Sequence, residues 1–241
     1  MNFYALIIGT EILNGRRIDK HFEFLRQELA KYGHELCSSI VVKDDKNLMR
    51  NMYNLVKADK DSILFSFGGI GSTPDDLTRA IAAEIFTNKA LKRDEEFEKN
   101  IIERFGDEAY PHRIHMADLP QNSKLLFNPV NNMSGFSLEN RFFFTPGFPK
   151  MSHPMISNVI KKLFSKSIKK YRLTLLAQTS ENTLIDLMQK LPKEIELSSL
   201  PILKDDSFSV EISLASINEE LLKKYFNTFK TFLNEQNITY N

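Results

Sequence analysis

Two nearly uninterrupted apolar runs near the start of the chain, Phe3–Ile8 and Ser62–Phe67, constrain its fold more than any other feature. Each run ends directly at a glycine, Gly9 after the first and Gly68 after the second. Such runs are too short to cross a membrane and are typical of strands covered on both faces in a parallel sheet. The chain must therefore supply helices for both faces of that sheet.

Apolar residues at helical spacing occur between and after these two runs. The three clearest stripes are Phe22, Leu25, Leu29 and Tyr32; Leu48, Met49, Met52, Leu55 and Val56; and Leu77, Ala80, Ile81 and Ile85. A further strand is expected at Glu35–Val42, between the first two stripes. Because strands that alternate with helices form right-handed βαβ units, we predict a three-layer α/β/α fold with a mostly parallel, doubly wound sheet.

The middle of the chain is less regular, and we expect mostly loops over residues 107–123. Before it, Asp94–Phe105 has the spacing of an amphipathic helix. After it, two short strands are expected at Lys124–Phe127 and Arg141–Thr145, and Pro146–Pro149 ends the second of them.

A lysine-rich segment after about residue 160 marks the boundary between two predicted domains. The apolar stripe from Met155 to Leu163 predicts the helix that closes the first domain, residues 1–165. The remainder, residues 171–241, changes from buried to alternating strands. Its expected strands are Tyr171–Ala177, Ile195–Leu203, Phe208–Leu214 and Ile238–Tyr240, with helices over Leu184–Leu191 and about Asn218–Asn234. That order, βαββαβ, predicts a small α+β domain of the split βαβ type.

The charges of the chain nearly cancel: 32 basic and 31 acidic residues give a formal net charge of +1. Proteins that bind nucleic acid or a membrane surface usually have a basic excess, so we expect neither partner. Cys37 is the only cysteine, which excludes an intrachain disulfide and fits a reducing compartment. We therefore expect a cytoplasmic protein.

The segment from Gly68 to Thr78, with the sequence GGIGSTPDDLT, carries the strongest functional signal. It follows a buried strand and precedes a helical stripe, so its glycines let the backbone turn sharply and bring several N–H groups toward one point. The positive end of the following helix adds to this anion cradle. The segment lacks the Gly-Lys-Ser/Thr ending of a Walker loop, and its adjacent glycines do not fit the GxGxxG dinucleotide pattern.

The acidic pair Asp75-Asp76 in this segment has two interpretations. In the first, Thr73 caps a helix, Pro74 takes its first position and Asp76 completes a capping box. In the second, Asp75 or Asp76 holds a divalent cation against a phosphate, because carboxylates alone would repel that anion. Both interpretations can be true of the same residue, and the sequence leaves both open.

The same segment resembles the GGxG…DDxT signature of molybdopterin-binding domains of the Mog/MoaB type and of competence/damage-inducible protein A (CinA). Three further motifs resemble that family and occur in its order: Gly9–Gly15 followed by Asp19, Val42–Asp45, and Pro146–Pro149. Four motifs in one order over about 150 residues are more specific than any single motif. Residues 171–241 are similar to the small domain that follows in CinA proteins, and no CinA amide-hydrolase domain is expected after them.

This resemblance implies a phosphorylated small-molecule ligand, either a nucleotide diphosphate or a pterin such as molybdopterin. It implies catalytic roles for Asp44 and Asp76, and these two together with Asp75 would hold a divalent Mg, Mn or Co ion. The implied ligand-binding residues are Gly9, Glu11, Asp19, Gly68, Gly69, Gly71, Ser72, Thr73, Thr78, Pro146 and Gly147. A homo-oligomer is also expected.

Two classes of function remain open from the sequence. The retained aspartates, Asp44, Asp75 and Asp76, favour a metal-dependent pyrophosphatase that acts on an ADP-ribose-like or dinucleotide substrate, as the resemblance to CinA implies. The turn Asn131–Gly135, which replaces the GTAPG of the family, favours weakened or altered binding. The second class is a non-catalytic protein that binds molybdopterin or a nucleotide phosphate. We favour the hydrolase, with the binding protein as the alternative.

Overall fold

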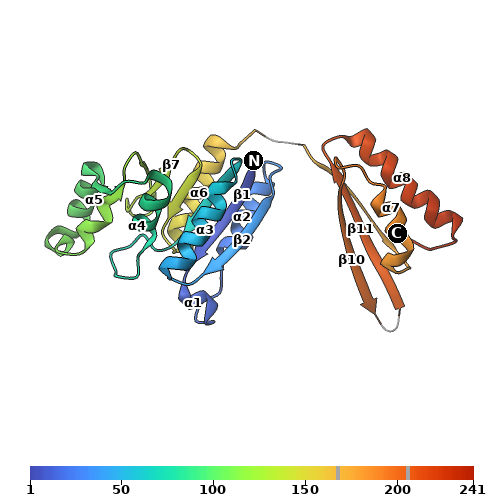
Figure 1. Ribbon diagram of the computed structural model, residues 1–241, viewed down its shortest axis with the longest axis horizontal. Helices are drawn as coiled ribbons and strands as arrows, with labels where there is room; N and C mark the ends of the chain where they lie inside the picture. The colour runs from blue at the N-terminus through green and yellow to red at the C-terminus, as the bar shows by residue number, and fades with distance from the viewer. Residues whose placement is uncertain (167–168, 205–206) are drawn as a thin grey trace. The chain divides into compact units, whose positions relative to one another are not determined.

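A computed structural model of the chain describes residues 1–166, 169–204 and 207–241 (Figure 1). The chain divides into two compact units, Met1–Ser167 and Ile168–Asn241. The first unit contains a large mixed sheet, and the second contains a small antiparallel one. Among the described residues, no helix is both long and apolar enough to span a membrane.

The first unit is built on a six-stranded sheet with the order β2-β1-β3-β8-β7-β6. Its parallel strands are β1 (Asn2–Ile8), β2 (Leu36–Val42), β3 (Ser62–Phe67) and β8 (Phe142–Thr145). Strand β7 (Gly135–Leu138), antiparallel to β8, and strand β6 (Lys124–Leu126), antiparallel to β7, extend it at one edge. Since β2 and β3 flank β1 on opposite sides, the switch point lies at the carboxyl ends of β1 and β3. The predicted mostly parallel, doubly wound sheet is confirmed.

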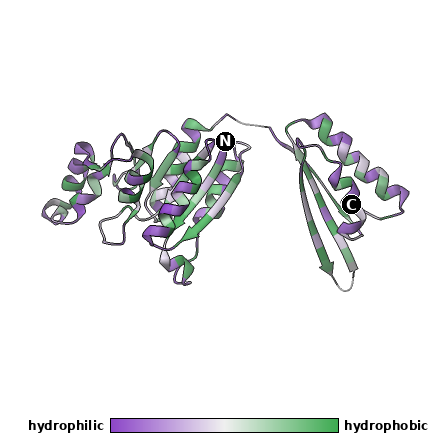
Figure 2. Ribbon diagram, in the orientation of Figure 1, coloured by the Kyte–Doolittle hydropathy of each residue, from purple (hydrophilic) through white to green (hydrophobic). Residues whose placement is uncertain are grey.

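Helices cover both faces of this sheet and complete the predicted three layers. One face packs against α2 (His21–Ala30) and α6 (Pro149–Leu163), and the other against α3 (Lys46–Ala58) and α4 (Thr78–Ala82). Alternate residues of β1 enter the two cores, because Ile7 joins Leu25 and Ile156 whereas Leu6 joins Tyr53. Figure 2 shows hydrophobic residues along the strands and mixed colours on the helices, as expected for amphipathic helices on a buried sheet.

The helix expected after the glycine segment starts later than predicted. The first helical residue of α4 is Thr78, and the helix continues as a π-helical segment over Ala83–Thr87 that ends at the left-handed Asn88. Thr73 and Pro74 lie in a turn outside the helix. The prediction that these two residues cap and begin the helix is therefore wrong.

The middle of the first unit contains more regular structure than the sequence indicated. Its elements are β4 (Leu91–Arg93), α5 (Glu95–Phe105), two 3-10 helices (Gly106–Ala109 and Arg113–Ala117) and β5 (Asp118–Pro120), which pairs with β4. Strand β7 was also not predicted, because Gly135 and Ser137 interrupt its apolar residues. A Cβ atom on Gly135 would lie 2.2 Å from the Phe144 carbonyl oxygen, so glycine permits the close approach of β7 to β8.

The second unit has the predicted split βαβ arrangement. Its elements are β9 (Tyr171–Ala177), a 3-10 turn (Glu181–Leu184), α7 (Ile185–Gln189), β10 (Glu196–Lys204), β11 (Ser207–Ser216) and α8 (Glu219–Glu235). The sheet order is β10-β11-β9, and β11 runs antiparallel to both neighbours. The strand expected at Ile238–Tyr240 is reduced to a single bridge between Tyr240 and Ala177. Helix α8 buries Leu222 and Phe229 against this sheet.

Candidate functional site

A hollow of about 600 Å³ opens at the carboxyl edge of the large sheet, beside the switch point. Its walls come from residues that follow β1, β2, β3 and β8, and open α/β sheets bind their ligands at this position. The lining residues are Ile8, Glu11, Arg16, Arg17, Asp44, Gly68, Gly69, Gly71, Ser72, Thr73, Asp75, Asp76, Gly147 and Phe148. We call this hollow the glycine pocket.

The turn after β3 requires glycine at two successive positions. Gly68 and Gly69 have φ angles of 103° and 68°, in the left-handed region that disfavours side chains. A Cβ atom would lie 2.5 Å from the Ile8 carbonyl oxygen at Gly68, and 2.4 Å from Thr78 Oγ1 at Gly69. Thr78 fixes the turn, since its hydroxyl donates to the Gly68 carbonyl at 2.9 Å and its amide to the Gly69 carbonyl at 3.0 Å. Thr78 is fully buried and therefore positions the turn without lining the pocket.

Asp76 organises the next part of the loop. Its Oδ2 atom accepts hydrogen bonds from the Thr73 amide at 2.8 Å and from the Thr73 hydroxyl at 2.6 Å. These bonds resemble half of a capping box, but they close a turn that precedes α4 rather than the helix itself. Thr73, together with the Asp75 backbone, also lowers the pKa of Asp75. A Cβ atom on Gly71 would lie 2.6 Å from Asp76 Oδ2, so glycine leaves room for this carboxylate.

Asp44 is held on the other side of the pocket by Thr10. Its Oδ2 atom accepts from the Thr10 amide and from the Thr10 hydroxyl, both at 2.8 Å. Among the residues that the structure describes, no hydrogen bond uses Oδ1 of Asp44 or Oδ1 of Asp76. Each predicted catalytic carboxylate therefore has one oxygen fixed by a threonine and one oxygen available to a ligand.

Glu11 and Gly9 shape the pocket in different ways. Glu11 lines it, and its Oε1 lies 3.8 Å from Arg17 Nη1. Gly9 does not line the pocket, and its amide donates to the Val42 carbonyl at 3.0 Å. A Cβ atom on Gly9 would lie 3.1 Å from the Glu11 carboxylate, so Gly9 gives that side chain its space.

Besides Gly9 and Thr78, two more of the predicted ligand-binding residues, Asp19 and Pro146, lie outside the glycine pocket. Asp19 accepts hydrogen bonds from the amides of His21 at 2.8 Å and Phe22 at 3.1 Å, and so stabilises the start of α2. It lines an adjoining hollow of about 490 Å³ that shares Gly147 with the glycine pocket. Pro146 lines neither hollow.

A buried histidine supports the loop that contains Gly147. The Nε2 atom of His21 donates to the Gly147 carbonyl at 3.2 Å, and the His21 ring stacks on Phe67 with centroids 4.3 Å apart. His153 Nε2 lies 3.3 Å from His21 Nδ1. Burial lowers the pKa of His21, and burial with the neighbouring His21 lowers the pKa of His153 to about 4. Both rings are therefore neutral at neutral pH, which suits a structural contact.

Four lining residues were not predicted from the sequence: Ile8, Arg16, Arg17 and Phe148. The Arg17 guanidinium lies 5.4 Å from the centre of the Phe148 ring, within the range of a cation–π contact. Phe148 is 53% exposed, so its ring is not used in the core. The two arginines place positive charge opposite the carboxylates, in a pocket that the glycine turn also borders. The adjacent pair of arginines directly after Gly15 is the sequence signal that could have identified Arg16 and Arg17.

The oxygen donors of the pocket suit a hard divalent cation. Asp44, Asp75 and Asp76 all line it. Among the described residues, no group of three or more His, Cys, Asp or Glu side chains is arranged to hold a metal. A cation here would therefore need further ligands from a substrate, as is usual for Mg²⁺, which is commonly bound by one or two carboxylates plus substrate phosphates.

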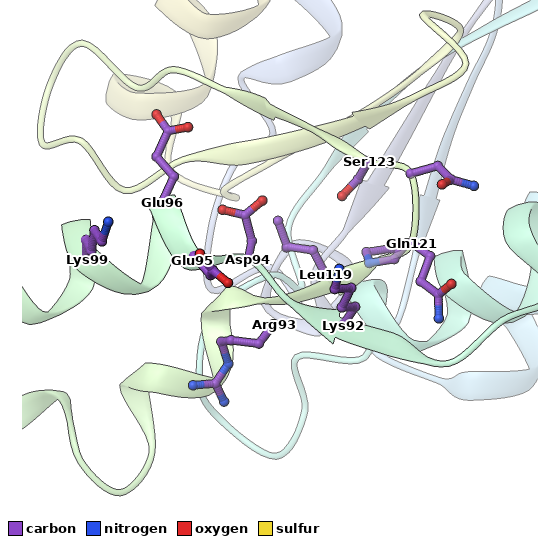
Figure 3. Close-up of a pocket in the computed structure, with 11 residues that line it drawn as sticks. Lys92, Arg93, Asp94, Glu95, Glu96, Lys99, Leu119, Gln121 and Ser123 are labelled. Atoms are coloured by element: carbon purple, nitrogen blue, oxygen red, sulfur yellow. The ribbon is translucent and has the colours of Figure 1, made fainter.

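A hollow of about 550 Å³ at the start of α5 shares no lining residue with the glycine pocket. Figure 3 shows side chains of both charges around it, including Asp94 and Lys99. Asp94 accepts from the Phe97 amide at 2.9 Å and caps α5, while Arg93 is paired with Asp118 at 2.6 Å. Because these groups have partners within the protein, we place the candidate site at the glycine pocket.

The fold and the pocket together define an α/β domain with a glycine turn at its switch point. The family described as "Probable molybdopterin binding domain" matches residues 4–166. That match covers more than half of the chain, and the chain therefore belongs to this family. The predicted resemblance is confirmed.

Individual relatives agree with this assignment. A CinA-like protein from Fusobacterium nucleatum is 28% identical over 167 residues, which are 68% of this chain and 39% of the relative. A relative from Clostridium botulinum is 28% identical over 239 residues, 91% of this chain and 56% of its own length. The structure of CinA from Thermoplasma acidophilum, described as of unknown function, has 26% identity and a TM-score of 0.60, covering 67% of this chain and 98% of that one. This chain thus spans about half the length, or less, of the curated relatives it matches.

Proposed function

We propose that the glycine pocket binds a phosphorylated small molecule and cleaves its pyrophosphate bond with the help of a divalent cation. One observation carries the proposal: a single hollow combines the glycine turn, two arginines and three aspartates. Backbone amides and guanidinium groups are good phosphate ligands. The aspartates would repel a phosphate unless a cation lay between them.

Each set of residues has a distinct role in this proposal. Arg16, Arg17 and the amides of the turn would bind and orient the phosphates. Asp44 and Asp76, joined by Asp75, would hold the cation, which would neutralise phosphate charge and make a bound water more acidic. During hydrolysis the water oxygen bonds to one phosphorus, the bridging P–O bond breaks, and the bridging oxygen leaves with the other phosphate. Asp44 or Asp76 takes the proton of the attacking water.

A second function is favoured by the hydrogen bonds of the same aspartates. Asp44 and Asp76 each use one carboxylate oxygen to hold a threonine, which gives both a structural role that needs no catalysis. In that case the pocket would bind molybdopterin or a nucleotide phosphate with little turnover. Both functions place the same phosphate on the glycine turn and differ only in bond cleavage.

The test is a binding and hydrolysis assay on the purified chain. Thermal shift and calorimetry would use ADP, ADP-ribose and molybdopterin, each with and without Mg²⁺, Mn²⁺ or Co²⁺. Products would be separated by chromatography. Binding with metal-dependent cleavage of ADP-ribose supports the hydrolase, and binding without cleavage supports the second function. Failure of all three ligands to bind would overturn both.

A matched control is available beside Asp44. Asp45 is exposed and accepts from the amides of Asn47 at 3.0 Å and Leu48 at 2.9 Å, so it caps α3 and does not line the pocket. Asp45→Asn removes the same charge from the neighbouring position, and asparagine is an equally good cap. We expect this variant to bind and react like the unmodified chain.

A further inference from the structure

The turn that borders the glycine pocket also borders another hollow, of about 590 Å³. Ser72 and Thr73 line both hollows. The far wall of this second hollow comes from residues 108–113 and includes Tyr110 and Arg113. Because Ser72 and Thr73 belong to both linings, the two hollows adjoin at this turn. We call the second space the Tyr110 hollow.

The walls of the Tyr110 hollow suit a planar group. Tyr110 is 58% exposed, so its ring is not used in the core of the domain. Pro74, an exposed residue on the turn, adds a second apolar surface. Exposed aromatic side chains in pockets stack on nucleobases and similar rings without needing a particular base.

Arg113 is held in one position at the wall of the same hollow. Its Nη1 atom donates to the Glu108 carboxylate at 2.6 Å and to the Glu108 carbonyl at 3.1 Å. Its guanidinium lies 4.6 Å from the centre of the Phe105 ring. A side chain that is already ordered loses little entropy when a ligand binds against it.

The lining residues give the two hollows a linear order. Of these two hollows, Phe148 lines the glycine pocket alone, Tyr110 lines the Tyr110 hollow alone, and Ser72 and Thr73 line both. An exposed aromatic ring therefore stands on each side of the shared turn. The arginines and aspartates of the glycine pocket lie on the Phe148 side of it.

We propose that the Tyr110 hollow is a second subsite, which binds a planar heteroaromatic ring attached to the far end of the phosphate chain. The inference rests on the proposed function, since it takes the glycine pocket as the place of the phosphates. The preferred ligand then has a ring at both ends: one against Phe148, the pyrophosphate over the glycine turn, and the other against Tyr110 and Pro74. A nucleoside diphosphate would fill only the glycine pocket, whereas a dinucleoside pyrophosphate would fill the glycine pocket and the Tyr110 hollow.

The test compares two ligands that differ in the second ring. Calorimetry would measure the Kd of ADP and of diadenosine diphosphate for the unmodified chain, Tyr110→Ala and Tyr110→Phe. We expect the unmodified chain to bind diadenosine diphosphate about tenfold more tightly than ADP, because stacking of one base supplies a difference of that order. Tyr110→Ala should abolish the difference and leave the Kd of ADP unchanged, whereas Tyr110→Phe should retain it. Phe127→Ala, which removes another exposed aromatic ring that lines neither hollow, is the control.

Failure of the subsite and failure of the proposed function give different results. Equal affinity of the unmodified chain for the two ligands would overturn the subsite and leave phosphate binding in place. The subsite would also be overturned if Tyr110→Ala weakened the binding of both ligands equally, or the binding of neither. Absence of binding by both ligands to the unmodified chain would overturn the phosphate site and the subsite together.

Discussion

Thr10 and Asp44 are joined by three hydrogen bonds across the carboxyl edge of the large sheet. Asp44 Oδ2 accepts from the amide and the hydroxyl of Thr10, and the hydroxyl accepts from the Asp44 amide at 3.3 Å. Thr10 follows β1 and Asp44 follows β2, so the pair connects two loops beside the glycine pocket. An aspartate in place of Thr10 would set two carboxylates against each other here.

The first prediction concerns the hydroxyl of Thr10. Thr10→Val removes it with little change in shape, and two of the three hydrogen bonds are lost with it. At about 1 kcal/mol for each hydrogen bond, we expect a stability loss of about 2 kcal/mol. Asp44 would then be less well held, so ADP should also bind more weakly. Thr10→Ser restores the hydroxyl and should recover both properties. Urea denaturation and calorimetry measure the two effects, and unchanged affinity in Thr10→Val would show that Asp44 needs no support from this residue.

The sequence predicts those features of the site that depend on local structure. The buried runs of β1 and β3 are local signals, and the doubly wound order then places the residues after both strands at one edge. Gly68, Gly69 and Asp44 could therefore be placed near one another before the structure was known.

Other features depend on how distant segments meet, and these were not predicted. Arg17 and Phe148 are 131 positions apart in number, and only the packed loops bring the guanidinium to the ring. The helix start moved to Thr78 because its amide and hydroxyl hold the two glycine carbonyls, an arrangement that a capping pattern does not reveal. Asp19 matched a family motif, yet its carboxylate is used at the start of α2.

The second prediction separates two glycines of the turn. Gly69→Ala places a Cβ at a φ of 68° and against buried Thr78, so we expect a loss of about 1–2 kcal/mol in the free energy of unfolding. Gly71→Ala has no such backbone strain, but its Cβ displaces the Asp76 carboxylate. We expect that variant to fold normally and to bind ADP at least about tenfold more weakly, a change of about 1.4 kcal/mol. Normal ADP affinity in Gly71→Ala would place the phosphate elsewhere.

The third prediction concerns pH and the pair of neighbouring histidines, buried His21 and half-buried His153. Burial lowers the pKa of His21 and, together with His21, lowers that of His153 to about 4. In the unfolded chain both histidines have a pKa of about 6.5. Between the lowered pKa values of the folded state and this value, the unfolded state binds more protons than the folded state. Their contribution to stability is therefore present above about pH 6.5 and is lost as the pH falls toward 4.

Urea denaturation of the unmodified chain and of His153→Gln across this range is the measurement. Carboxyl groups also titrate toward its lower end, but they are common to both proteins, so the difference between the two curves reports His153. We expect the slope of the free energy of unfolding against pH to be smaller in His153→Gln. Parallel curves would contradict the role assigned to the histidine pair.

The fourth prediction concerns the boundary between the two units. Trypsin should cut between Phe164 and Tyr171, where Lys166 and Lys169 are exposed. Phe164 belongs to the core of the first unit, so the N-terminal fragment should keep its own cooperative thermal transition. Mass spectrometry identifies the cut. Cleavage mainly within residues 1–160, with the boundary intact, would mean that the chain does not divide here.

The fifth prediction separates structure from chemistry at Asp76. Asparagine keeps an oxygen that can accept from the Thr73 amide, so Asp76→Asn should fold with a loss of only about 1 kcal/mol. If Asp76 helps to hold a cation, the same change should abolish metal-dependent cleavage, because the charge is lost. Asp44→Asn should behave alike, and Asp45→Asn should remain active. A stable Asp76→Asn protein with full activity would mean that Asp76 only stabilises the turn and has no role in catalysis.

The double variant decides whether the two aspartates act on one ion. Asp44 and Asp76 line the same pocket from loops that follow different strands, β2 and β3, and they accept hydrogen bonds from different threonines. Their effects on stability should therefore add. Their effects on metal affinity should not, since removing either carboxylate already weakens a shared site and the second removal costs less. Calorimetric titration with Mn²⁺ in the presence of ADP measures this coupling. It compares the unmodified chain, Asp44→Asn, Asp76→Asn and the double variant. Strictly additive losses in metal affinity would assign the two carboxylates to separate roles.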